Sequence, residues 1–249
     1  MEQRIRGNET DVDGLSLSGH SSRQYDQDLE WIRSKVLLMG GLVEDQFRDA
    51  MAAMERGDVA LAERVVAGDA RVNREEVGLD HACAQLIVRR QPAANDLRNV
   101  MATVKVISDL ERMGDEATKI ARAVKNIRSG DLLLPDHYRA VIGMSHTAKR
   151  MMHEALDAYA RMDTAAALAL MAVDDVVDAE FHDIVCSLIE YMRREPEAVE
   201  AGVNLLRAAK AIERIGDHAT NIAEFIVYVV EGKDIRHTDY RLQTEGTMR

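Results

Sequence analysis

The chain contains the same pattern twice, and this internal repeat constrains its fold more than any other feature. Residues 111–121 (ERMGDEATKIA) reappear as residues 213–223 (ERIGDHATNIA), 102 positions later. Further upstream, Asp69 and Asn73 match Asp174 and Asp178, 105 positions later, so the two repeats differ by a few residues of loop length. A repeat of about 100 residues is longer than the roughly 20–50-residue unit of a solenoid, so two similar domains are expected.

The composition indicates that both repeats are helical. Aromatic residues make up 4% of the 249 residues and there are three prolines, whereas charged residues make up 30%. This usage is typical of helices rather than strands. Glycine, proline and aspartate breaks divide the chain into six predicted helices, at residues 23–56, 58–90, 93–129, 136–161, 163–193 and 196–231.

Short turns make consecutive helices antiparallel neighbours, so each repeat is expected to form a three-helix bundle. We therefore predict an all-α, elongated fold of two tandem, duplicated three-helix bundles placed in line, spanning residues 23–130 and 131–231. Residues 1–22 and 232–249 are polar ends and are expected to be disordered tails.

Charge and cysteine usage exclude several classes of protein. The formal net charge of −11 disfavours nucleic acids and anionic lipids as partners, and it favours cations or basic protein surfaces. Two cysteines far apart in sequence fit a reducing cytosol rather than a disulfide framework. There is neither a signal peptide nor a stretch long enough to span a membrane, so a cytoplasmic protein is expected.

The third helix of each repeat carries an apolar stripe at alternating steps of three and four residues, which indicates a bundle core. Gly114 and Gly216 interrupt the two stripes at equivalent positions. Because glycine costs a helix interior roughly 1 kcal/mol relative to alanine, its presence at both positions predicts close packing of a neighbouring helix.

Acidic side chains follow the flank of the same helices. Glu111 and Asp115 lie four residues apart, as do Glu213 and Asp217, and such pairs face the same way and repel each other. The middle helices repeat the spacing, and their oxygen atoms could share one cation or bridge two. The candidate metal ligands are Glu111, Asp115, Glu213, Asp217, Asp174, Asp178, Asp69 and Asn73.

The alternative interpretation is a solvated acidic surface with local ion pairs to Arg112 and Arg214, which would contribute little to stability. Oxygen-only ligands fit magnesium, calcium, manganese or ferric iron better than zinc. No E-x-x-H motif is present, so the usual di-iron bundle site is missing. His182 and His218 are expected to lie at the surface, and Cys83 and Cys186 in the core.

The run D-L-E-R-M-G-D at residues 109–115, its copy at residues 213–217, M-G-G-L-V-E at residues 39–44 and R-Q-P at residues 90–92 closely resemble the PhoU family. The resemblance covers about residues 20–231. It implies paired three-helix bundles whose acidic motifs bind metal, with multinuclear iron, zinc, manganese or magnesium as candidates. Asn73 departs from the strict acidic pattern and weakens that site.

The resemblance also implies a function. PhoU proteins are non-enzymatic negative regulators of phosphate-starvation signalling and damp high-affinity phosphate uptake. They contact the ATPase subunit of the phosphate ABC transporter and a sensor histidine kinase. A cytoplasmic homodimer that reaches the membrane only through partners is expected. The rival hypotheses are a carboxylate-bridged metal store or metalloenzyme, and a purely structural scaffold.

Overall fold

The computed structural model describes residues 23–127 and 134–235. These residues form six α-helices and one short 3-10 turn, with no strand among them. The elements are α1 (Arg23–Arg56), α2 (Val59–Arg90), α3 (Ala94–Ile127), α4 (Pro135–Arg161), α5 (Thr164–Arg194), η2 (Pro196–Ala198) and α6 (Val199–Glu231). The prediction of an all-α fold built from two three-helix bundles is confirmed.

Equivalent turns begin the second helix of each bundle. The Asp58 carboxylate accepts a hydrogen bond from the backbone N–H of Leu61 at the start of α2, and Asp163 accepts one from Ala166 at the start of α5. Each aspartate therefore satisfies a backbone donor that the helix itself leaves unpaired. The two repeats therefore share the same helix cap as well as a similar sequence.

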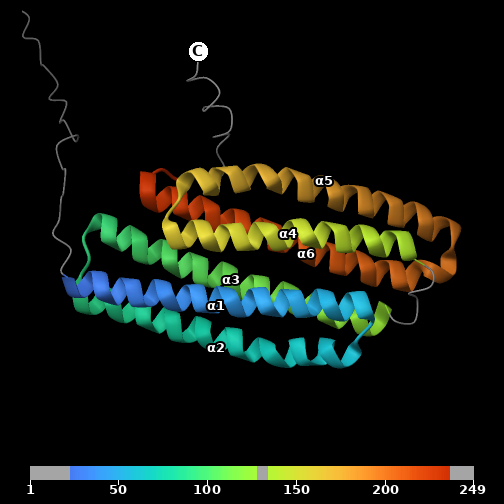
Figure 1. Ribbon diagram of the computed structural model, residues 1–249, viewed down its shortest axis with the longest axis horizontal. Coiled ribbons are helices and arrows are strands. Elements are labelled where there is room, and N and C mark those ends of the chain that lie inside the picture. Colours follow the sequence, from blue (N-terminus) through green and yellow to red (C-terminus); the bar gives the residue numbers. More distant parts are fainter. Residues whose placement is uncertain (1–22, 128–133, 236–249) are drawn as a thin grey trace, which may run out of the picture.

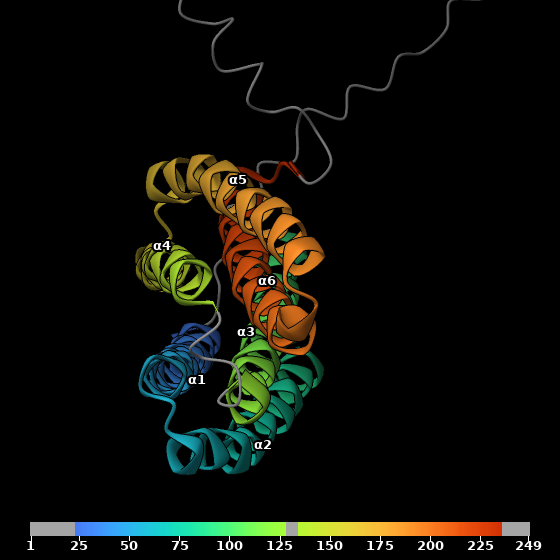
Figure 2. The same ribbon diagram turned by 90° about the vertical axis from the view of Figure 1, so that its right-hand side faces the viewer.

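The two bundles lie side by side along their length (Figure 1). Helices α3 and α6 run next to each other through the middle of the molecule and form its most extensive helix pair. Seen end-on, α2 and α5 lie at opposite ends, while α1 and α4 lie together on one side (Figure 2). The prediction of bundles placed in line is therefore wrong, because α3 and α6 each bury a second face against the other bundle.

Gly40 explains how α1 and α4 approach each other. A Cβ atom at this buried position would lie 2.5 Å from Cδ2 of Leu156 on α4. The M-G-G-L segment of α1 is therefore a packing notch for the second bundle. One continuous hydrophobic core includes buried side chains of all six helices.

The predicted boundary near residue 130 and the predicted tails at 1–22 and 236–249 lie outside the described residues, and the division into domains there stays a prediction. Residues 232–235 are described, and Ile235 is 3% exposed, so the chain still packs against the protein beyond α6. Within the described ranges, none of the helices has an apolar segment that could cross a membrane.

Candidate metal centre

Three of the predicted ligands, from α5 and α6, lie close together. Asp178 of α5 and Glu213 and Asp217 of α6 each offer a carboxylate oxygen, and these three atoms lie within 4.8 Å of one another. Glu213 is buried, Asp217 is partly buried and Asp178 is exposed. We call this set the α5–α6 cluster. The cluster brings oxygen atoms from two helices close enough to bind one cation.

Asp174 lies one turn before Asp178 and is electrostatically linked to the cluster. Burial, together with the charges of Asp217 and Asp178, raises the pKa of Asp174 to about 6. Burial also raises the pKa of Asp217, and the nearby Lys210 opposes that rise. These carboxylates are held together although they repel, and a bound cation would relieve the repulsion.

Glu213 leaves one oxygen atom without a partner. Its Oε1 accepts a hydrogen bond from Lys210 Nζ at 2.5 Å, whereas its Oε2 is buried and has no hydrogen-bond partner among the described residues. An unpaired buried carboxylate oxygen costs free energy, and a ligand bound to it would offset that cost. The donor set and this orphaned atom both fit a metal ion.

The first bundle carries its acids on the corresponding helices, α2 and α3. Burial, then the charges of Asp115, Glu76 and Asp69, raise the pKa of Glu111. Among residues 23–127 and 134–235, however, only the α5–α6 cluster brings three such ligand atoms within 4.8 Å. The two predicted sites are therefore not equivalent in the structure.

Two residue differences explain the contrast. Asn73 occupies the position that Asp178 has in the second bundle, and it donates a long hydrogen bond of 3.5 Å to Asp69 Oδ2. Gln46 occupies the position of Met151, and its Nε2 donates to Asp69 Oδ1 at 3.1 Å. Asp69 is thus held by protein donors. The carbonyl oxygen of Asn73 is buried without a partner and stays available to a cation.

Sequence reasoning did not assign roles to Gln46 and Lys210. Lys210 lies three residues before Glu213, a spacing that places the two side chains on one helix face. Gln46 comes from a different helix, and no local pattern connects it with Asp69.

The expected positions of histidine and cysteine are only partly correct. His218 is buried and donates from Nδ1 to Asp109 Oδ1 at 2.9 Å, so the expectation of a surface histidine is wrong there. His182 is exposed as expected. Cys83 is buried, but Cys186 is exposed, contrary to the prediction. The described cluster contains carboxylates alone, which favours hard cations.

The family comparison gives two matches, one in each bundle. The PhoU domain family matches residues 36–124 and 141–226. The chain belongs to the PhoU family.

Similar proteins align with most of the chain. It is 44% identical over 230 residues to the phosphate-specific transport system accessory protein PhoU of Edwardsiella tarda, covering 91% of this chain and 92% of the relative. The Escherichia coli K12 protein of the same name is 42% identical over 229 residues, covering 91% and 93%.

A crystal structure of PhoU from Pseudomonas aeruginosa superposes with a TM-score of 0.81 at 41% identity. The alignment covers 84% of this chain and all of that one. The phosphate transport system regulatory protein PhoU from Streptococcus pneumoniae gives a TM-score of 0.79 at 26% identity, covering 85% and 99%. The arrangement of six helices is therefore shared with solved PhoU structures.

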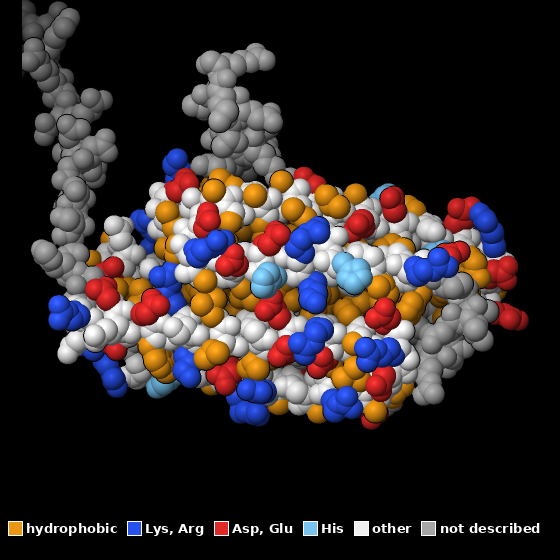
Figure 3. All heavy atoms as spheres, in the orientation of Figure 1, with side chains coloured by type: hydrophobic (Ala, Val, Ile, Leu, Met, Phe, Trp, Pro, Cys, Tyr) orange, Lys and Arg blue, Asp and Glu red, His pale blue; other side chains and the backbone are white. Residues whose placement is uncertain are grey.

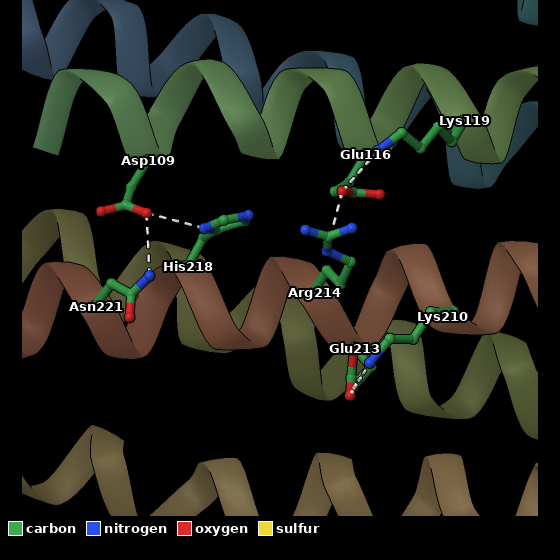
Figure 4. Close-up of polar contacts among 8 residues, drawn as sticks. All are labelled: Asp109, Glu116, Lys119, Lys210, Glu213, Arg214, His218 and Asn221. Carbon is green, nitrogen blue, oxygen red and sulfur yellow. Dashed lines mark hydrogen bonds and ion pairs between the residues drawn. The ribbon is translucent and has the colours of Figure 1, made fainter. Parts of the chain in front are cut away.

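The two halves of the chain also meet through buried polar groups (Figure 4). Asp109 of α3 accepts hydrogen bonds from His218 Nδ1 at 2.9 Å and from Asn221 Nδ2 at 3.1 Å, both on α6. Glu116 of α3 pairs with Lys119 Nζ at 2.8 Å and with Arg214 Nε at 3.3 Å. Buried acids thus fix the register of α3 against α6.

Proposed function

We propose that this protein regulates phosphate uptake and represses phosphate-starvation signalling without acting as an enzyme itself. The proposal is supported by relatives that are at least 42% identical along nearly the whole chain and are named as accessory proteins of phosphate-specific transport. The helical architecture, with elongated side-by-side bundles, offers long surfaces for protein partners.

The proposed regulator carries metal at the α5–α6 cluster. The observation that supports this most directly is the approach of Asp178, Glu213 and Asp217 within 4.8 Å, with Glu213 Oε2 left unpaired. A cation there would be held by these three residues and Asp174, and would supply a positive charge that cross-links α5 to α6. Glu111, Asp115, Asp69 and Asn73 would hold a second ion more weakly.

All of the proposed ligands are oxygen atoms, so iron in its ferric state, manganese and magnesium are favoured over zinc. A carboxylate-bridged metal store or metalloenzyme remains the rival function. Oxygen consumption by metal-loaded protein distinguishes the two, because the proposed regulator should show none.

The proposed partners are the ATPase subunit of a phosphate ABC transporter and a sensor histidine kinase, with a homodimer as the working form in the cytoplasm. Nucleic acid is not expected as a partner, and membrane contact would come only through these proteins. One face of the molecule intersperses acidic and basic side chains over its surface (Figure 3). Charges of both signs on that face suit specific docking more than a general attraction.

The metal proposal is tested with the triple variant D178N/E213Q/D217N, which keeps side-chain size but removes three charges. We expect it to lose most of its bound metal by elemental analysis and to lose the increase in Tm that added manganese gives the wild type. A ligand at about 100 times its Kd stabilises by about 2.7 kcal/mol. The matched control D183N/E197Q/E200Q neutralises three exposed acids outside the cluster and should behave like wild type.

The same variants test the regulatory proposal in cells that lack the chromosomal gene. A phosphate-starvation reporter should be repressed by wild type and by the control in high phosphate, and derepressed with the cluster variant. Retained metal together with intact repression in D178N/E213Q/D217N would show that the metal proposal is wrong.

A further inference from the structure

A pocket of about 340 Å³ lies between α3 and α6, beside the buried polar contacts of the interface. Its walls come from both bundles, and apart from two alanines every lining residue is charged. The charged lining residues are Glu116, Lys119 and Arg122 of α3 and Arg207, Lys210 and Arg214 of α6. Five cations and one acid face the same small space in a chain whose net charge is −11. We call it the interface pocket.

Gathering five cations is unfavourable unless something compensates their repulsion. Glu116 compensates two of them, since it pairs with Lys119 and Arg214. Lys210 pairs with Glu213. Arg122 and Arg207 are exposed and make no ion pair with any residue of the described part of the chain. Two guanidinium groups from different bundles are therefore available to an incoming anion.

We propose that the interface pocket binds a small phosphate-bearing anion, either inorganic phosphate or the phosphate groups of a larger molecule such as a nucleotide. Guanidinium groups match phosphate geometry because they donate two parallel hydrogen bonds. The volume lies in the range of small-molecule sites, and five of the eight lining side chains carry a positive charge. This excess of positive charge favours a compact, negatively charged ligand.

A regulatory role for the interface pocket rests on the proposed function. A ligand held by Arg122 of α3 and Arg207 of α6 would bridge the two bundles. A higher ligand concentration would therefore stabilise the contact between them. Lys210 lines the pocket and also donates to Glu213 of the α5–α6 cluster. A cation at Glu213 would compete for that carboxylate and release Lys210 toward the pocket, and such coupling acts equally in both directions.

The test is calorimetric titration of the full chain with inorganic phosphate, pyrophosphate and ATP in the presence of EDTA. Wild type should bind at least one probe at a single saturable site. The variant R122A/R207A should bind about 10-fold more weakly or worse, because it loses two charge-assisted contacts. The matched control R74A/R193A removes two exposed arginines elsewhere and should keep wild-type affinity. Comparing the three probes distinguishes free phosphate from a larger phosphate compound.

Several results would overturn the proposal. The first two are the absence of saturable binding for every probe and an equal loss of affinity in R74A/R193A. The third is tighter binding of a polyaspartate peptide than of any phosphate compound. The fourth is binding that requires metal and is retained by R122A/R207A. The reporter strain distinguishes this failure from failure of the proposed function. If the wild type represses the reporter but binds no phosphate compound, only the proposal of anion binding in the interface pocket is refuted. If the wild type cannot restore repression, the proposed function itself is contradicted.

Discussion

At the scale of single residues, the surroundings of an acidic side chain decide what it can do. Asp178 is exposed and can reach a cation together with Glu213, whereas Asp109 is buried and accepts hydrogen bonds from His218 and Asn221 of α6. Both are acids on long helices, and their immediate sequence does not distinguish them. The difference comes from which helix each side chain faces.

Asp174→Asn should stabilise the metal-free protein at about pH 8 more than at about pH 4.5. The pKa of Asp174 is raised from its ordinary 3.8 to about 6, chiefly by burial. Because the folded pKa is the higher one, ionisation costs stability, and the penalty grows from about pH 4 and is complete above about pH 6. The full shift equals about 3 kcal/mol, which solvent screening reduces to about 1–2 kcal/mol. Urea unfolding in EDTA measures the gain, and equal gains at both pH values would refute this expectation.

The paired glycines give a second prediction at this scale. A Cβ at Gly216 would have neighbours at 3.6–3.7 Å, which is ordinary contact, whereas at Gly114 it would lie 3.1 Å from Gln46 Oε1 and 3.3 Å from Val72 Cγ1. Gly216→Ala should therefore stabilise the protein by up to about 1 kcal/mol through helix propensity. Gly114→Ala should gain less or destabilise. Urea unfolding of both variants checks this, and the reverse order would contradict the packing described for α3.

At the scale of helices, α3 and α6 are distinguished by having two buried faces. One face carries the apolar stripe of its own bundle, including Leu110 and Met113 on α3, which are fully buried. The other face packs on the opposite bundle and carries acids, histidine and alanine. An acidic residue on that second face looks like a surface residue in sequence, although Glu116 is 3% exposed.

Asp109→Ala should destabilise the protein by about 2–3 kcal/mol, because it leaves the buried donor of His218 and the partly buried donor of Asn221 without their acceptor. Asp157→Ala is the control, since Asp157 makes an exposed pair with Arg161 one turn away on α4. Its loss should cost less than about 0.5 kcal/mol. Thermal or urea unfolding compares the two, and similar small effects would show that the interface contact does not matter for stability.

At the scale of the whole molecule, a single core joins the two bundles. Helices α3 and α6 share the most extensive interface. Unfolding of either helix would therefore expose the buried face of the other. We therefore expect the two repeats to unfold together.

Urea unfolding should accordingly show one transition. Trp31 is the single tryptophan and lies on α1, so its fluorescence reports on the first bundle, while circular dichroism reports on all six helices. The two signals should change at the same urea concentration, as expected for cooperative unfolding. Separate midpoints would indicate that the bundles unfold independently.

The sequence by itself determined the six helices, the aspartate breaks between them, the duplication and the rows of oxygen donors. These follow from interactions within a few residues, namely helical periodicity and local capping, which a linear pattern records. Only the tertiary structure decided that the bundles lie side by side, that His218 is buried on Asp109, that three acids converge in one half but not in the other, and that basic residues of both halves share a pocket. Those outcomes depend on how distant helix faces dock, and packing between faces leaves no periodic signal in the chain.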